Sequence, residues 1–244
     1  MRKGFHEPTE KPRRFYKAVT VAQADGGYAV LLDGRTLSGP KGTKLVLPTR
    51  ALADQVAEEW AAQGETIEFG GMHATRLANT ALEAVGPARA AIADQIADYA
   101  GSDLLCYLAT EPQGLIQRQT ERWGPVLDRA EAAEGLRLSR VAGVVHQAQP
   151  ADTLIRVRDT ALALDDYGMA GLAFGASLFG SAILAIAVLR GWLGGVEAFE
   201  LSRLDEAWTE EKWGVDAEAA QRTERLRGEA AMLQRWFAGL PPAT

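Results

Sequence analysis

The feature that most constrains this chain is a long stretch, from Tyr167 to Leu189, that contains no charged side chain. A stretch of this length is sufficient to cross a bilayer, which takes about 20 residues. Gly171 and Gly175 have the small-xxx-small spacing that lets membrane helices approach one another closely. A segment so free of charge must lie either in lipid or inside a protein core.

The composition of the stretch favours the protein core. Its end near Asp165 and Asp166 offers no aromatic belt beyond Tyr167. Two packed helices, broken between Gly175 and Gly180 and buried from all sides, would explain the same residues. We therefore expect a buried helical pair and no stable membrane insertion. A membrane-associated protein that uses residues 167–189 remains the alternative. The small and polar residues that dilute the stretch are Gly168, Gly171, Gly175, Ser177, Gly180 and Ser181.

Length and composition are those of an ordinary globular protein. The chain has 244 residues, of which 47% are hydrophobic and 24% charged, enough for one large domain or two modest ones. Its formal net charge of −6 argues against general nucleic-acid binding, which needs a basic face. Cys106 is the only cysteine and lies in an apolar run, which predicts a buried, unreactive thiol.

The sequence contains no motif for a metal or cofactor. The three histidines, His6, His73 and His146, are far apart and lack the spacing of paired ligands. No glycine loop is followed by Lys and Ser or Thr, and the glycine-rich residues 168–180 lack the dinucleotide fingerprint. We therefore expect neither a metal nor a cofactor.

The first third of the chain predicts a small antiparallel β-meander followed by a helix. Alternating apolar residues and turn signals suggest strands at residues 15–21, 28–32, 35–37 and 44–47. Thr49 can cap the helix that follows, and Leu52, Val56 and Trp60 share one face of it. Residues 66–69 predict a further short strand.

Beyond about residue 75, every strong pattern is helical, so the fold class is α+β, with a small N-terminal unit and a larger C-terminal helical unit. We expect a flexible arm over residues 1–14, an N-terminal α+β domain over 15–75 and a helical domain over 76–244. Gly124-Pro125 predicts a kink or restart in one helix. A single helix is expected to run from about Glu197 to Gly214, with Leu201, Leu204 and Trp208 on its buried face.

Tryptophans mark several segments along the chain. Trp is large and needs a partner for its indole N–H, so repeated Trp beside carboxylates suggests packed junctions or a protein-binding surface. We assign structural roles to Trp60 and Trp123, and partner binding to Trp208 and Trp213.

A cluster of carboxylates near the C-terminus has three possible uses. Asp205, Glu206, Glu210 and Glu211 fall on one expected helix, and Glu206 and Glu210 are i, i+4 neighbours whose charges repel. The cluster can be a solvated acidic face, a partner-binding patch flanked by Trp208, or a general acid–base pair.

Residues 72–81 form a second candidate region. Thr75, Asn79 and Thr80 can cap or brace a joint between the two expected domains, which assigns a structural role to Asn79. Arg76 can instead pair with a carboxylate across that joint or on a partner.

With these residues placed, the chain resembles the assembly chaperone family of the F-type ATP synthase catalytic head that is specific for the alpha subunit. Each motif alone is weak, but their collinear order over roughly residues 14–220 is fairly specific. The segments that carry the resemblance are Arg14-Phe15-Tyr16-Lys17, Leu32-Asp33-Gly34-Arg35, Leu47-Pro48-Thr49, Glu59-Trp60, Thr75-Arg76-Leu77-Ala78-Asn79-Thr80-Ala81, Asp103-Leu104-Leu105-Cys106-Tyr107, Gln119 with Trp123 and Pro125, Gly180-Ser181 and Trp213-Gly214.

The chain departs from the family pattern at three places. His73 stands where members commonly have Pro, Glu83 where they often have Asp, and Trp208-Thr209 where they usually have Gln. The last departure concerns the detailed use of residues 205–213.

The resemblance implies a chaperone that holds the free alpha subunit and prevents its aggregation until the beta subunit replaces it. It implies an α+β N-terminal domain and a larger C-terminal orthogonal α-helical bundle, with no enzyme activity and no cofactor. It singles out Glu206 as the residue most important for function, with Trp60 important for folding. We expect a monomer when free, in a bacterial cytoplasm or, in a eukaryote, in the mitochondrial matrix. The alternative class is a small-molecule enzyme that uses the Glu206 and Glu210 carboxylates.

Overall fold

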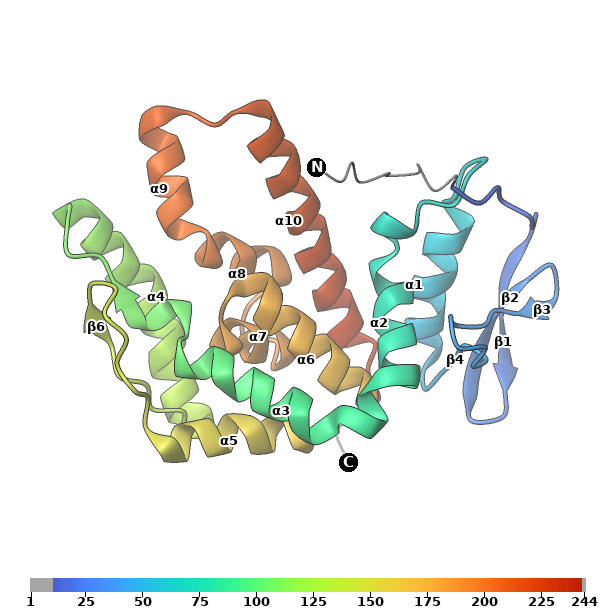
Figure 1. Cartoon of the computed structure of the whole chain (residues 1–244), viewed down its shortest axis with the longest axis horizontal. Helices are drawn as coiled ribbons and strands as arrows, with labels where there is room; N and C mark the ends of the chain where they lie inside the picture. Colours follow the sequence, from blue (N-terminus) through green and yellow to red (C-terminus); the bar gives the residue numbers. More distant parts are fainter. Residues whose placement is uncertain (1–10, 243–244) are drawn as a thin grey trace, which may run out of the picture.

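The computed structural model of the chain describes residues 11–242, with a small sheet at one end and helices over the remaining length (Figure 1). The strands are β1 (Val19–Ala24), β2 (Gly27–Leu32), β3 (Arg35–Thr36) and β4 (Val46–Leu47) in one sheet, with β5 (Tyr107–Leu108) and β6 (Val141–Ala142) forming a parallel pair elsewhere. This arrangement confirms the predicted α+β class.

The N-terminal sheet is antiparallel throughout. β1 pairs with β2 from Val19 opposite Leu32 to Ala24 opposite Gly27, and β3 and β4 both pair with β2. Helix α1 (Arg50–Ala61) packs against this sheet, and its predicted inner face of Leu52, Val56 and Trp60 is buried. The Thr49 hydroxyl accepts a hydrogen bond from the Leu52 amide, as expected of the helix cap.

Three details of this region differ from the prediction. The first strand begins at Val19, not at Phe15. Residues 66–69 form no strand of their own: Thr66 makes one isolated bridge to Arg13, and Phe69–Gly71 is a 3₁₀ turn, η1. Within the expected arm of 1–14, residues 1–10 lie outside the described part of the chain, whereas the Ile67 amide donates to the Pro12 carbonyl and the Arg14 amide to that of Glu65.

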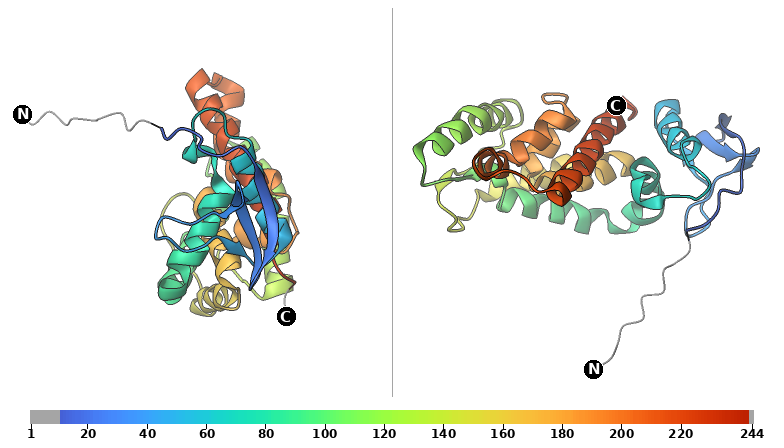
Figure 2. Two further views of the ribbon diagram at one scale, coloured as in Figure 1. Left: turned by 90° about the vertical axis from the view of Figure 1, so that its right-hand side faces the viewer. Right: turned by 90° about the horizontal axis from the view of Figure 1, so that it is seen from above.

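The helical region begins with two consecutive helices that point in different directions and continues as a bundle (Figure 1, Figure 2). Helix α2 passes through one π-helical turn, η2 (Ala81–Val85), directly into α3. After α3 comes the short turn η3 (Leu104–Cys106), and helices α3, α4, α5, α8 and α10 pack around a central pair, α6 and α7. The helices are α2 (His73–Thr80), α3 (Gly86–Gly101), α4 (Gln113–Glu134), α5 (Ala151–Leu162), α6 (Asp166–Phe179), α7 (Ala182–Leu189), α8 (Gly195–Ser202), α9 (Leu204–Trp213) and α10 (Ala217–Ala238).

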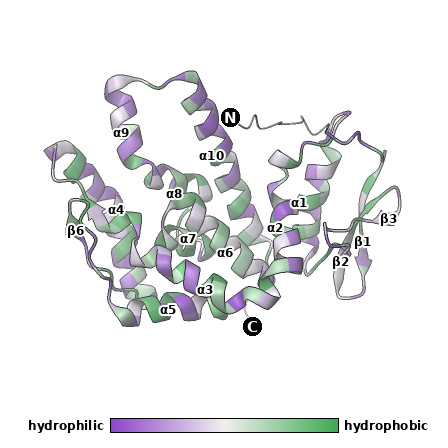
Figure 3. Ribbon diagram, viewed as in Figure 1, coloured by the Kyte–Doolittle hydropathy of each residue, from purple (hydrophilic) through white to green (hydrophobic). Residues whose placement is uncertain are grey.

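The uncharged stretch forms the predicted helical pair, but only α7 is buried on all sides: on α6, Ser177 is exposed and Phe174 and Leu178 are half-buried. α6 ends at Gly180, which adopts the left-handed conformation (φ 62°), and the Ser181 hydroxyl then caps α7 by accepting from the Leu184 amide. Every residue of α7 from Ala182 to Val188 is buried, and the apolar residues gather inside the bundle (Figure 3). Over residues 11–242, no helix combines the length and apolar character that a membrane span requires.

The two glycines of the small-xxx-small pair serve helix packing inside the protein. A Cβ on Gly171 would lie 2.7 Å from Phe237 Cε1, and one on Gly175 would lie 2.9 Å from Leu233 Cδ2. Both neighbours belong to α10, which therefore approaches α6 closely only because these positions lack a side chain.

Two expected helices have different boundaries. α4 runs without interruption from Gln113 to Glu134 with Pro125 inside it, so the predicted restart at Gly124-Pro125 is wrong. The helix expected from Glu197 to Gly214 is two helices, α8 and α9, divided at Arg203, whose backbone (φ −111°, ψ 21°) is not helical. Trp123 Nε1–H donates to the Leu201 carbonyl at 3.0 Å, which ties α4 to the end of α8.

A buried carboxyl joins η3 to α7. Asp103 is fully buried and accepts hydrogen bonds from the Leu105 and Ile183 amides. Burial raises the pKa of Asp103 to about 6, although hydrogen bonds from Ser181 and the backbone act in the opposite direction. The adjacent Cys106 is fully buried as predicted, and burial raises the pKa of its thiol to about 12.

Substitution of Gly171 by Ala is expected to destabilise the protein by about 1–3 kcal/mol, because Trp236 and Phe237 leave no space for a methyl group. Gly228→Ala is the matched control, since a Cβ there meets nothing within 4 Å and α10 gains helix propensity of up to about 1 kcal/mol. Urea unfolding of both variants measures the difference. Equal stability of the two variants would show that α6 and α10 have room to separate.

The raised pKa of Asp103 predicts a pH-dependent term in stability. Its native pKa of about 6 exceeds the ordinary value of 3.8, so the native state holds the proton more tightly than the unfolded chain. The stabilisation of the native state by the proton on Asp103 is complete below pH 3.8 and is lost as pH rises through about 6, which changes the free energy of unfolding by up to about 3 kcal/mol. Relative to Asp103→Asn, the wild type should therefore lose unfolding free energy between pH 4 and pH 7. A constant difference across this range would contradict the raised pKa.

Candidate functional site

Helix α9, which carries most of the candidate partner-binding residues, lies outside the main core. Among its residues only Leu204 is buried, and Gly214 (φ 81°) ends the helix as predicted. Figure 1 shows α9 extending away from the bundle between α4 and α10. Its position therefore depends on contacts made by its polar and aromatic side chains.

Trp208 attaches α9 to α4. A Cβ on Gly114 would lie 2.8 Å from Trp208 Cη2, so the indole ring rests on a surface that only glycine leaves open. The Arg118 guanidinium lies 4.6 Å from the centre of the ring, and Lys212 Nζ lies 4.4 Å from it. Arg118 also pairs with both carboxylate oxygens of Glu211, at 2.6 and 3.0 Å, which lowers the pKa of Glu211. Trp208 is half-buried and not part of a fully buried face.

Two of the carboxylates are also engaged within the molecule. The fully buried Gln119 donates to Asp205 from its side-chain nitrogen at 2.7 Å and accepts from the Ala109 amide at 2.7 Å. Arg203 pairs with Glu210 at 2.6 Å. Asp205 therefore ties α9 to Gln119 of α4, which the sequence offered only as part of a motif, whereas the Arg203–Glu210 pair is local to α9 and the residue that precedes it.

Glu206 and Trp213 remain available for a partner. Glu206 is exposed and makes no hydrogen bond or ion pair with residues 11–242. It lines a groove of about 800 Å³ formed by α10, the ends of α6 and α8, and the segment of η3 and β5. The other charged residues of this groove are Arg203, Asp216, Glu218 and Arg222. Trp213, at the end of α9, is 84% exposed.

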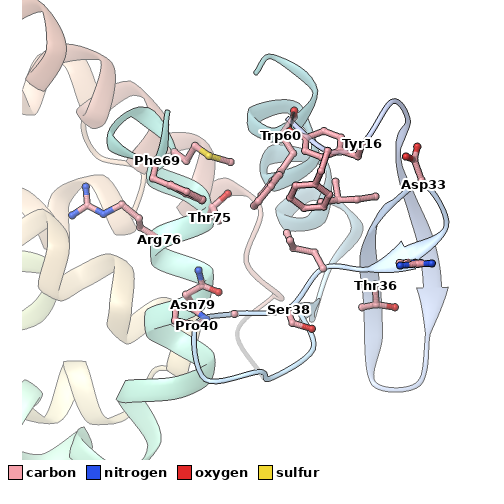
Figure 4. A pocket seen from close by; sticks show the side chains of 16 residues that line it. Tyr16, Asp33, Thr36, Ser38, Pro40, Trp60, Phe69, Thr75, Arg76 and Asn79 are labelled. Carbon is pink, nitrogen blue, oxygen red and sulfur yellow. Dashed lines mark hydrogen bonds between the residues drawn. The ribbon is translucent and has the colours of Figure 1, made fainter. Parts of the chain in front are cut away.

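Arg76 belongs to a different surface, a cleft of about 890 Å³ between the N-terminal sheet and α2 (Figure 4). Trp60 and Asn79, which were assigned structural roles, line the same cleft. Arg76 is exposed and has no ion pair in the described part of the chain. The structure thus separates Arg76 from the α9 residues with which it was grouped.

Trp60 and Trp123 both have the packing expected of structural residues. Trp60 is 5% exposed, its backbone carbonyl accepts a hydrogen bond from the Tyr16 hydroxyl at 2.7 Å, and its ring lies 6.2 Å from that of Phe69. Sequence reasoning missed Phe15 and Phe69 at the mouth of the cleft, which are 73% and 50% exposed. Phe69 precedes Gly70-Gly71, a signal that indicated only a flexible joint.

Glu210 is paired with Arg203, whereas Glu206 has no ion pair within residues 11–242, so the two carboxylates lie in different electrostatic environments. Within residues 11–242, no three side chains of His, Cys, Asp or Glu are grouped to hold a metal ion. The geometry of both surfaces is that of binding surfaces with aromatic and charged side chains.

Trp60→Arg is expected to destabilise the protein severely, by about 3–5 kcal/mol, because it removes a buried ring and places a charge among Leu52 and Val56. Trp213→Arg makes the same chemical change at an exposed site and should alter stability by no more than about 0.5 kcal/mol. Thermal melts followed by circular dichroism compare the two. A Trp60→Arg protein that melts like the Trp213→Arg protein would show that the α1 face tolerates a charge.

Comparison with known proteins adds independent information. The sequence model of the family described as ATP12 chaperone protein matches residues 13–131. The crystal structure of Atp12 from Paracoccus denitrificans is 38% identical and has a TM-score of 0.85, with 93% of this chain and 97% of that chain covered. A point mutant of the same protein matches equally well.

Two further relatives agree. A protein of Agrobacterium tumefaciens for which a chaperone role has been suggested is 40% identical, with a TM-score of 0.89, over 94% of this chain and 87% of its own. Protein atp12 of Schizosaccharomyces pombe, which is described as mitochondrial, is 26% identical over 219 residues, or 85% of this chain and 75% of the relative. The similarity therefore extends over both the sheet and the helical region.

Proposed function

Since this chain belongs to the ATP12 chaperone family, we propose that it acts in assembly of the F-type ATP synthase by binding the free alpha subunit of the catalytic head. In this proposal it prevents aggregation of the alpha subunit until the beta subunit replaces it. An unassembled subunit of a ring exposes interface that would otherwise aggregate, so covering that surface is a sufficient function without any bond-making chemistry.

The observation that carries the proposal is that some residues of α9 anchor the helix while others are exposed and unpaired within the described chain. Asp205, Trp208 and Glu211 attach the helix to α4, while Glu206 and Trp213 face solvent without a partner in the described chain. An exposed carboxylate and an exposed indole on one anchored helix form a mixed polar and aromatic surface. Such a surface suits a complex that must form firmly and still be displaced.

An enzyme that uses the Glu206 and Glu210 carboxylates is the less favoured alternative. The Arg203–Glu210 ion pair leaves only one of the two carboxylates free, and the groove beside Glu206 is open. The relatives for which a role is stated are chaperones. Both points support a binding function over catalysis.

Location, oligomeric state and domain organisation complete the proposal. The fission yeast relative is described as mitochondrial, and we propose the mitochondrial matrix for a eukaryotic host and the cytoplasm for a bacterial one. We further propose that the free protein is a monomer. The division of the chain near residue 75 stays a prediction, since α2 continues into α3 while also packing on α1.

The proposal is tested by co-expressing this chain with the ATP synthase alpha subunit of its host in the absence of beta. Affinity pull-down and gel filtration should yield a stoichiometric complex that added beta subunit dissolves. Alpha subunit that aggregates to the same extent with and without this chain would refute the proposal.

Within that assay, Glu206→Lys is expected to weaken the complex at least tenfold while shifting the melting temperature by no more than a few degrees, because Glu206 is exposed and unpaired within residues 11–242. Glu224→Lys on α10 makes the same charge change at an exposed site outside the groove and should bind like the wild type. Comparable weakening by both variants would indicate a general charge effect in place of a specific contact.

A further inference from the structure

The cleft between the N-terminal sheet and α2 has an apolar interior. Leu37 from the segment after β3, Trp60 from α1 and Met72 before α2 form its buried walls. Phe15 and Phe69 extend the apolar surface outward to the mouth of the cleft, where they are exposed to solvent. Exposed aromatic rings that continue a concave apolar surface are characteristic of sites that bind another molecule.

Two polar atoms beneath this surface have no hydrogen-bond partner in the described chain: Trp60 Nε1, a donor, and Asn79 Oδ1, an acceptor. Each such group costs about 1–3 kcal/mol when it is left unsatisfied in a buried position. Trp60 is 5% exposed, and its ring lies 5.6 Å from that of Tyr16 and 6.2 Å from that of Phe69. Because the indole nitrogen itself is buried, side chains around it must move before an occupant reaches the N–H.

The backbone of a bound segment offers partners for both atoms. A carbonyl oxygen of the segment can accept from Trp60 Nε1–H, and an amide can donate to Asn79 Oδ1. The loop that bears Gly39 packs closely against this oxygen, since a Cβ on Gly39 would lie 2.8 Å from Asn79 Oδ1. Glu83 secures the same loop by accepting from the Lys41 amide at 3.1 Å.

The unpaired charge of the cleft is positive, although the whole chain carries a formal net charge of −6. Arg35 and Arg76 line the cleft, are exposed and make no ion pair with residues 11–242. The only carboxylate among the lining residues, Asp33, already accepts hydrogen bonds from the Lys17 and Ala18 amides, which lower its pKa. An occupant with a carboxylate would satisfy the arginines.

From these features we infer that the cleft is a second client-binding site, which takes an extended segment of the client polypeptide that carries an apolar side chain next to an Asp or Glu. The inference rests on the proposed chaperone function and specifies a surface separate from α9. The apolar side chain enters between Phe15 and Phe69, and backbone groups of the segment face Trp60 and Asn79. The acidic side chain pairs with Arg76, whose exposed side chain points away from Trp60 in Figure 4 and turns toward the cleft on binding.

Two variants on opposite sides of the cleft test the inference in the co-expression assay with the alpha subunit. Arg76→Glu reverses the charge on α2, and Phe15→Ser removes the exposed ring before β1; both side chains are exposed, so folding should be retained. Arg156→Glu, on α5 and outside the cleft, is the matched charge control. We expect at least tenfold weaker binding for each cleft variant, less than twofold for the control, and melting temperatures within a few degrees of the wild type.

A photo-crosslinking residue in place of Phe15 supplies direct evidence, because it should attach to one client segment with adjacent apolar and acidic residues. Wild-type binding by both cleft variants, or crosslinks scattered over the client, would overturn the inference while the chaperone function stands. A small molecule that co-purifies with the wild type in native mass spectrometry and is lost in Arg76→Glu would overturn it in favour of a small-ligand site. If the wild type itself binds no alpha subunit, the proposed function fails, and the inference fails with it.

Discussion

The burial of the uncharged α6–α7 pair is the constraint on which the remaining structure depends. Because α7 is buried on all sides, other helices must surround it, and α3, α4, α8 and α10 all pack against it. Gly171 and Gly175 admit α10 to close contact, and Asp103 satisfies an amide at the start of α7 from a different segment. The neighbouring helices thus provide the apolar surroundings that a lipid bilayer would provide for a membrane helix of the same composition.

α10 connects this core to the N-terminal part of the chain. Two hydrogen bonds attach α1 to the C-terminal end of α10. The Thr49 hydroxyl donates to the Gly239 carbonyl at 2.5 Å, and the Gln55 side chain donates to the Arg235 carbonyl at 2.9 Å. The cleft beside α2 and the exposed surface of α9 therefore belong to parts of the protein that are packed together through α10. A chaperone with two separate contact surfaces can hold a client by combining modest affinities.

The contrast between the two surfaces has a physical basis. α9 has only one buried residue and is held by polar and cation–π contacts, so its exposed side chains are accessible while the helix direction stays fixed. The cleft has the opposite character, with buried apolar walls and unsatisfied polar atoms. One surface offers charge and aromatic area, and the other offers a concave shape.

The sequence by itself determined the features that depend on periodicity and local chemistry. These include the α+β class, the buried face of α1, the cap at Thr49, and the buried helical pair with its break at Gly180, because apolar spacing and capping residues act over a few neighbours. Only the tertiary structure decided the break at Arg203, the continuity of α4 through Pro125 and the partners of Asp205 and Glu210. It also brought Trp60, Arg76 and Asn79 into one cleft, since contacts between distant segments depend on how the helices pack and not on local sequence.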